Sequence, residues 1–251
     1  MASTYLTKTF ASSGTSDKIA TISLWCKRAV TGAENSIITA GASLRDLIRF
    51  ETSGALRVRL SNGASDLTTN RLFRDVSAWY NLIIKFDTTQ ATASDRIKIY
   101  VNGVEETSFS TTTYPSQNQT LKLGTANPNH IGNDSEQTNP YFNGSMTHFH
   151  FIDGTAYDAS TFGESDSVSG IWKPKTAPSV TYGTNGFFLK MENSGAMGTD
   201  SSGNSNTFTV NGTLTQNVDT PSNNFATLNA INNFYPEATF SNGNLKITTK
   251  E

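Results

Sequence analysis

A run of oxygen-bearing side chains lies between residues 193 and 206, where Asp200 is followed by Asn204 and Asn206. Calcium takes roughly six to eight oxygen ligands from carboxylate, amide and carbonyl groups. These three side chains, with Asp153 as a fourth, predict a calcium site. The alternative is a turn rich in Gly and Asn whose side chains cap their own backbone. The small number of carboxylates favours the turn.

Aromatic residues with polar neighbours form a second group of candidates. A saccharide site needs a planar ring that stacks on the apolar face of the sugar, beside groups that hydrogen-bond to its hydroxyls. Tyr141 has such neighbours in Asp134, Asn139 and Asn143, and Trp172 lies between Gly and Pro in a segment that could expose its ring. These residues are the carbohydrate-binding candidates. The alternative is that both rings pack as lids over the ends of a β-sandwich.

Local patterns for catalysis are missing from the sequence. Retaining glycosidases use two carboxylates about 5 Å apart, whereas adjacent Glu105 and Glu106 must point to opposite faces of a strand. His148 and His150 would share one face of a strand, as a metal pair does, but their alternation with phenylalanines favours an outward polar face. No Ser or Cys stands in a nucleophile motif with His. The sequence therefore predicts a protein that is not an enzyme.

Composition excludes further classes of function. The chain has 251 residues, a net charge of −2 and an isoelectric point near 5.9, so the basic patch that binds nucleic acid is absent. No apolar run is long enough for a spanning helix, and no apolar signal core follows Met1, so we expect neither membrane insertion nor secretion. The lone Cys26 excludes an intramolecular disulfide and suggests a reducing compartment.

Alternating apolar residues predict antiparallel strands. The clearest are residues 80–86 and 97–101, separated by a polar loop and followed by the hairpin signal Asn102-Gly103. We expect one core built from the inward residues of such strands, namely Ile22, Leu24, Leu82, Ile84, Phe86, Ile97, Ile99, Val101, Phe149 and Phe151. On a hairpin around Ser53-Gly54 we expect the outward side chains Arg49, Arg57 and Arg59 to point to solvent.

These patterns resemble the laminin-G-like, concanavalin-A-like jelly-roll sandwiches. The resemblance rests on Thr21-Ile-Ser-Leu-Trp-Cys26, on Trp79-Tyr80 before a strand, on the Asn102-Gly103 hairpin, and on Ile131-Gly132 followed by Tyr141-Phe-Asn-Gly144. It implies an all-β jelly-roll β-sandwich over residues 1–212, with an irregular C-terminal extension over 213–251. Sandwiches of this family serve as lectins, adhesive modules and glycosidases, so the fold alone leaves the function open.

A second resemblance covers later segments of the chain. Residues 153–164, 170–174, 182–187 and 219–229 are similar to phrases in uncharacterised proteins of tailed phages, marine ones especially. This implies a virion structural or adhesion module, made in the host cytoplasm: a tail fibre, a capsid fibre or a capsid decoration. Its partners would be other virion subunits and a cell-surface glycan. The alternative is a polysaccharide depolymerase on the same fold, which the missing carboxylate pair disfavours.

The segment after Thr213 carries many apolar residues, spaced irregularly among Asn, Thr, Pro and Gly. It has too much apolar surface to leave in water and too little regularity to form its own core. One interpretation is that it folds back along its own sandwich; it could also be an extended arm or the start of a further domain. We favour an arm that crosses to a neighbouring subunit, where residues 245–249 add a strand to an open sheet edge. Because virion proteins of this kind are commonly threefold, we expect a homotrimer.

Overall fold

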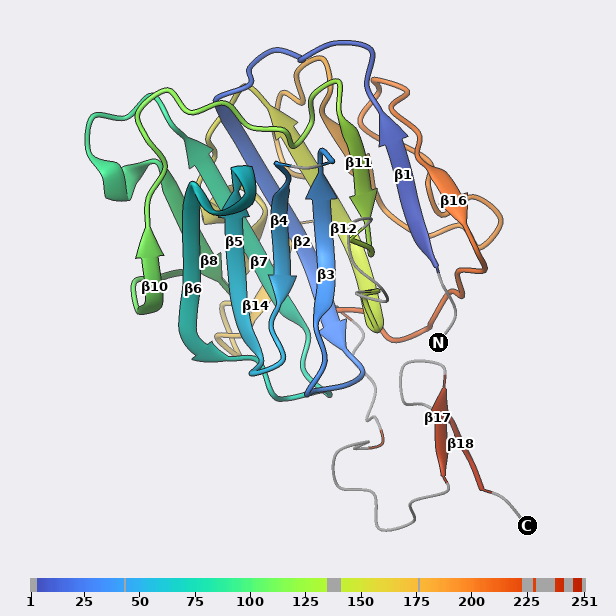
Figure 1. Ribbon diagram of the computed structural model, residues 1–251. Coiled ribbons are helices and arrows are strands. Elements are labelled where there is room, and N and C mark those ends of the chain that lie inside the picture. The colour runs from blue at the N-terminus through green and yellow to red at the C-terminus, as the bar shows by residue number, and fades with distance from the viewer. Residues whose placement is uncertain are drawn as a thin grey trace.

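The chain folds into two antiparallel β-sheets packed face to face (Figure 1). The computed structural model describes residues 4–42, 44–134, 141–175, 177–222, 228, 238–241 and 246–249. Within these residues the structure contains strands and three short 3₁₀ turns, at Ser61–Gly63, Ala93–Asp95 and Ala159–Thr161, and no α-helix. The predicted all-β jelly-roll sandwich is confirmed.

The front sheet has eight strands in the order β10-β6-β5-β4-β3-β11-β1-β16. Their bounds are β1 (Tyr5–Thr9), β3 (Asn35–Ala40), β4 (Asp46–Phe50), β5 (Ala55–Leu60), β6 (Ser65–Leu72), β10 (Phe109–Thr113), β11 (Pro128–Ile131) and β16 (Thr209–Asn211). The back sheet has six strands in the order β15-β12-β2-β7-β8-β9. They are β2 (Ile19–Arg28), β7 (Tyr80–Asp87), β8 (Ile97–Val101), β9 (Val104–Glu106), β12 (Gly144–Asp153) and β15 (Phe187–Leu189).

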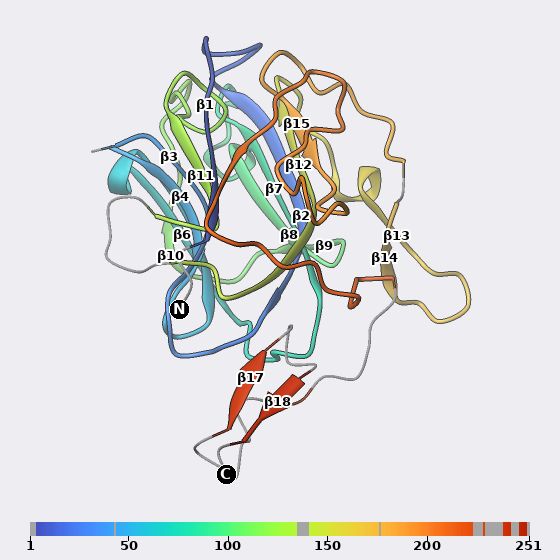
Figure 2. The same ribbon diagram turned by 90° about the vertical axis from the view of Figure 1, so that its right-hand side faces the viewer.

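Two further strand pairs lie outside these sheets. The hairpin of β13 (Gly163–Ser165) and β14 (Trp172–Pro174) follows β12, and β17 (Thr239–Ser241) pairs with β18 (Lys246–Thr248) near the C-terminus. Figure 2 shows the front and back sheets as two layers, with the orange-red stretch after β16 running from one layer toward the other.

The core fills the space between the two layers. Every residue predicted for it is buried there, because strand alternation sends one side chain in two toward the opposite sheet. In the back sheet the cross-strand pairs Leu82–Val101, Ile84–Ile99 and Phe86–Ile97 stack apolar side chains along the inner face. The predicted hairpin turn joins β8 to β9, with Asn102 and Gly103 both at positive φ.

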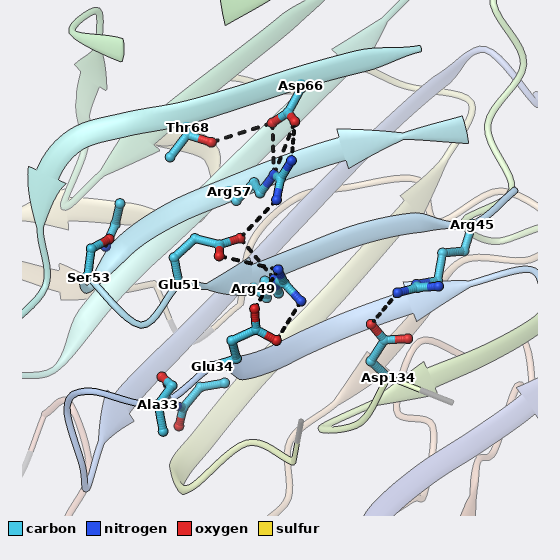
Figure 3. Close-up of polar contacts among 12 residues, drawn as sticks. Ala33, Glu34, Arg45, Arg49, Glu51, Ser53, Arg57, Asp66, Thr68 and Asp134 are labelled. Carbon is cyan, nitrogen blue, oxygen red and sulfur yellow. Dashed lines mark hydrogen bonds and ion pairs between the residues drawn. The ribbon is translucent and has the colours of Figure 1, made fainter. Parts of the chain in front are cut away.

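The prediction for the arginine face is wrong for Arg49. Its side chain lies on the outer face of the front sheet but is only 5% exposed, because it forms ion pairs with Glu34 and Glu51 (Figure 3). Arg57 is likewise bound to Asp66 rather than to water alone. Alternation placed these residues on the correct face, but it carries no information about the carboxylates beside them.

The prediction of an outward polar face at His148 and His150 is also wrong for His150. A bulge between Thr147 and His150 interrupts the pairing of β12 with β2, and His148 takes a positive φ. His150 is 2% exposed. Its ring stacks on Phe188 with centroids 3.9 Å apart, and its Nδ1 lies 2.8 Å from the hydroxyl of Tyr182.

A second apolar cluster accounts for this burial. Ile83, Ile152, Ala159 and Phe162 form it on the outer face of the back sheet, and Tyr157, Trp172 and Tyr182 pack against it. The segment after β12 therefore covers part of the outer face of the back sheet, so that β2 and the middle of β7 are buried on both faces. Strand alternation in β12 cannot reveal a covering segment that comes later in the chain.

Burial lowers the pKa of His150 from 6.5 to about 3, and the charge of His148 acts in the same direction. The fold holds His150 neutral, whereas the unfolded chain protonates it below about pH 6.5. The stability that this residue contributes is thus present above pH 6.5 and lost as the pH falls toward 3.

We expect the unfolding free energy of His150→Asn to depend less steeply on pH between 6.5 and 3 than that of the wild type, by up to about 1.4 kcal/mol per pH unit. Urea unfolding at a series of pH values measures it, and parallel profiles for the two proteins would contradict a neutral buried His150.

Candidate functional site

A groove of about 700 Å³ lies between β1 of the front sheet and β12 of the back sheet. One wall comes from residues 4–6 of the front sheet and the other from residues 141–148, which lead into β12. Residues 188–192 after β15 and the segment after β16 complete it. The groove thus combines four stretches that are distant in the sequence.

The lining is mixed aromatic and polar. Tyr141 and Tyr5 lie with ring centroids 6.0 Å apart and tilted by 42°, and Phe142 and Phe188 extend the aromatic surface. Hydroxyl, amide and charged side chains lie among these rings, contributed by Thr4, Asn143, Ser145, Thr147, Lys190, Glu192, Gln216 and Asn217. Rings beside hydrogen-bonding groups are what a saccharide requires.

Residues 213–222, which we call the strap, form the third side of the groove. The strap touches both layers of the sandwich. Its hydrogen bonds run from Thr4 Oγ1 to the carbonyl of Thr213 (3.3 Å), from Gln216 Nε2 to the carbonyl of Glu192 (2.6 Å) and from Asn217 Nδ2 to Ser145 Oγ (3.1 Å). This part of the C-terminal extension therefore folds back along its own sandwich. Residues 223–227, 229–237 and 242–245 lie outside the described residues. Within the edge strand predicted for residues 245–249, Lys246–Thr248 form β18, which pairs with β17.

Asp219 anchors the strap. Its carboxylate lies 2.7 Å from the ammonium of Lys27, both side chains being 3% exposed, and it accepts a hydrogen bond of 3.2 Å from Trp79 Nε1–H. Lys27 is on β2, a strand with neighbours on both sides. The sequence analysis did not select this pair. A lysine beside the apolar run Leu24-Trp25-Cys26 was the available signal, because a buried cation needs a partner.

The structure does not bring the carbohydrate candidates together at one site. Tyr141 and Asn143 both line the groove. Asp134 is fully buried and paired with Arg45 at 2.9 Å, and Asn139 lies outside the described residues. Trp172 is on the outer face of the back sheet, where its Nε1–H donates to Asn81 Oδ1 at 2.9 Å.

The interpretation of Trp172 as an exposed ring is therefore wrong. The ring lies over the β8–β9 turn, where a Cβ on Gly103 would come within 2.6 Å of it. Trp172 packs as a lid, as in the alternative interpretation, but over the outer face of the back sheet rather than over an end of the sandwich.

The carboxylates proposed as calcium ligands are occupied by hydrogen bonds. Asp200 and Asp153 each accept from three backbone N–H groups at distances between 2.7 and 2.9 Å. The donors to Asp200 are Phe188, Ser202 and Asn206, and the donors to Asp153 are Thr15, Ser16 and Asn185.

The two asparagines of this turn present donors rather than oxygens. Asn204 Nδ2 donates to the carbonyls of Gly183 and Gly186, and Asn206 Nδ2 to those of Thr184 and Gly186, at 2.6 to 3.0 Å. Across the described part of the chain no group of three or more His, Cys, Asp or Glu could hold a metal ion. The arrangement does not fit calcium. It matches the self-capping turn in part: Asp200 caps Ser202 and Asn206 of its own turn, whereas the two asparagine amides bind the backbone of residues 183–186.

We expect Asp219→Asn to lower the free energy of unfolding by about 3–5 kcal/mol, because it leaves Lys27 buried without its counter-charge. Urea unfolding measures the change. Glu164→Gln is the control, since Glu164 and its partner Lys173 are both about half exposed, and such a pair contributes about 0–1 kcal/mol. Adding Lys27→Met to Asp219→Asn should recover much of the loss. Equally small effects for both single variants would show that the pair does not hold the strap.

Comparison with known proteins agrees with this fold. A laminin G family model, described as the concanavalin A-like lectin/glucanases superfamily, matches residues 2–159. No curated protein matches. No helix in the described ranges is long and apolar enough to cross a membrane.

Solved structures with a similar fold share little sequence with the chain. A heptameric SAP-like pentraxin from Limulus polyphemus is 12% identical over 61% of this chain and 71% of its own, with a TM-score of 0.45. A Ruminococcus gnavus sialidase module, CBM40 bound to α2,3-sialyllactose, is 15% identical over 57% and 88%, with a TM-score of 0.39. Domains LG4-5 of the mouse laminin α1 chain are 15% identical over 72% and 49%, with a TM-score of 0.41. Because the family model covers more than half of the chain, the protein belongs to the concanavalin A-like lectin/glucanases superfamily.

Proposed function

We propose that this protein is a non-enzymatic carbohydrate-binding module whose saccharide lies in the groove between β1, β12 and the strap. The observation that carries the proposal is Tyr141 in the groove wall, with Asn143 two residues on in the same wall. Membership of a superfamily that contains lectins is consistent with it. A cavity of about 700 Å³ is within the range of small-molecule sites, roughly 300–1,000 Å³.

The wall around Tyr141 is held in place by backbone contacts. Phe142 N–H donates to the carbonyl of Gly132, and Asn143 N–H donates to Asn35 Oδ1 at 3.0 Å. The carbonyl of Asn143 in turn accepts from Ala29 N–H at 2.9 Å. Fixed rings and amides reduce the conformational entropy that binding would otherwise lose.

The groove's acidic groups favour binding over hydrolysis. Asp219 and Glu192 are the carboxylates among its described lining residues. Asp219 is held by Lys27 and Trp79, so it is not available to transfer a proton or attack a sugar. One remaining carboxylate does not supply the pair that glycosidases use. A polysaccharide depolymerase is the alternative, and release of reducing ends from a bound glycan would support it.

We propose further that the module belongs to a phage virion, on the basis of the four segments that resemble tailed-phage proteins. There it would join other virion subunits and present the groove to a cell-surface glycan. The strap belongs to its own sandwich, whereas β17 and β18 pair with each other, leaving Ile247 on β18 43% exposed. The C-terminal hairpin is therefore the part of the extension that we assign to contacts between subunits.

Light scattering tests the proposed assembly. The full chain should have the mass of a trimer, and a version ending at Ser222 should be a monomer with the strap and groove intact. We compare their melting midpoints to confirm that the shorter version is folded. The same mass for both would contradict a role for the hairpin in assembly.

A glycan array on the purified protein tests carbohydrate binding. For the glycans that bind, Tyr141→Ala should weaken affinity by about tenfold or more, equivalent to about 1.4 kcal/mol, because it removes the stacking ring. Trp172→Phe is the control: it changes an aromatic residue far from the groove and should leave affinity unchanged. Binding that survives Tyr141→Ala, or an array with no bound glycan, would contradict the proposal.

A further inference from the structure

The outer face of the front sheet carries four arginines on neighbouring strands. Arg45 precedes β4, Arg49 is on β4, and Arg57 and Arg59 are on β5. The strand register sets Arg49 opposite Arg57, and it sets Arg59 between Leu47 on β4 and Asp66 on β6. Since alternate residues share a face, these side chains all rise from the same surface.

Carboxylates match three of these arginines (Figure 3). The pairs are Arg45 with Asp134 at 2.9 Å, Arg49 with Glu34 at 2.7 Å and Glu51 at 2.9 Å, and Arg57 with Asp66, whose two oxygens face the guanidinium. Asp66 also accepts from Thr68 Oγ1. The acids near this face are therefore already bound.

Arg59 is the exception. It is half-buried, and its Nε–H is buried with no acceptor among the residues that the structure describes. Burial lowers the pKa of Arg59, and the positive charges of Arg57, Arg45 and Arg49 lower it further. The negative charge of Asp66 raises the pKa and offsets part of this effect. The Nε–H of Arg45 is likewise buried without an acceptor.

An unmatched, partly desolvated cation among like charges costs stability. Elsewhere on this face the charges are matched closely, so Arg59 departs from the pattern of its neighbours. A residue that lowers the stability of the fold, and for which the structure shows no compensating contact, is commonly a functional one. A negatively charged ligand at the accessible part of the guanidinium would offset this cost, because it would supply the missing charge.

We propose that Arg59, with Arg45 beside it, binds the oxyanion of a small ligand, a carboxylate or a sulfate group such as an acidic sugar carries. A planar guanidinium presents parallel N–H donors that fit both groups. Leu47, which lies beside Arg59 and is fully buried, gives the site an apolar floor. The site is on a different face from the groove and does not rest on the groove's function.

The experiment titrates the full chain with sodium sulfate, sodium glucuronate and glucose at constant ionic strength, maintained with sodium chloride. Melting midpoint and titration calorimetry are the readouts. We expect sulfate, glucuronate or both to bind and to raise the midpoint, and glucose to do neither; which anion binds identifies the group. Arg59→Gln should weaken anion binding at least tenfold, whereas Arg74→Gln, which removes an exposed arginine elsewhere, should not.

A second measurement separates this site from a structural role for Arg59. Without added anion, Arg59→Gln should melt at or above the wild-type midpoint, because it removes an unmatched charge. Arg49→Gln, which breaks two ion pairs, should melt lower. Equal anion affinity for the wild type and Arg59→Gln, no binding of either anion, or a lower midpoint for Arg59→Gln would overturn the proposal. Loss of glycan binding through Tyr141→Ala would leave these results unchanged.

Discussion

The groove depends on one buried ion pair, between Lys27 on β2 and Asp219 on the strap. A lysine in the middle of a sheet is costly unless a counter-charge reaches it. Here the counter-charge comes from 192 residues farther along the chain, and the strap runs from the front layer to the back layer to deliver it. The pair therefore fixes the path of residues 213–222, and that path makes an open sheet edge into a walled groove.

The outer faces of the two sheets are stabilised in different ways. The centre of the back sheet is buried on both sides, because the segment carrying Phe162, Trp172 and Tyr182 packs over its outer face. On the outer face of the front sheet, ion pairs match most of the arginines with carboxylates. The covered face explains the neutral His150, and the charged face explains why an unmatched Arg59 stands out.

The sequence was sufficient to predict the core and the fold class. Residues such as Leu82 and Ile99 alternate with polar ones, and that period of two follows directly from strand geometry. Local signals also located the Asn102-Gly103 turn, whose backbone demands these residue types. The bulge at His148, the covering of His150 and the placement of Trp172 were not predictable in this way, since each depends on contacts between segments distant in the chain. Of the carbohydrate candidates, Tyr141 and Asn143 share the groove, but the strap opposite them carries no local signal.

The central claim is that a saccharide binds between the aromatic wall and the strap. The most direct measurement is the backbone amide NMR spectrum during titration with a glycan that the protein binds. The account predicts that the largest shift changes fall on residues 141–148 and 213–220. Changes confined to the outer face of the front sheet, or to residues 163–174, would contradict it.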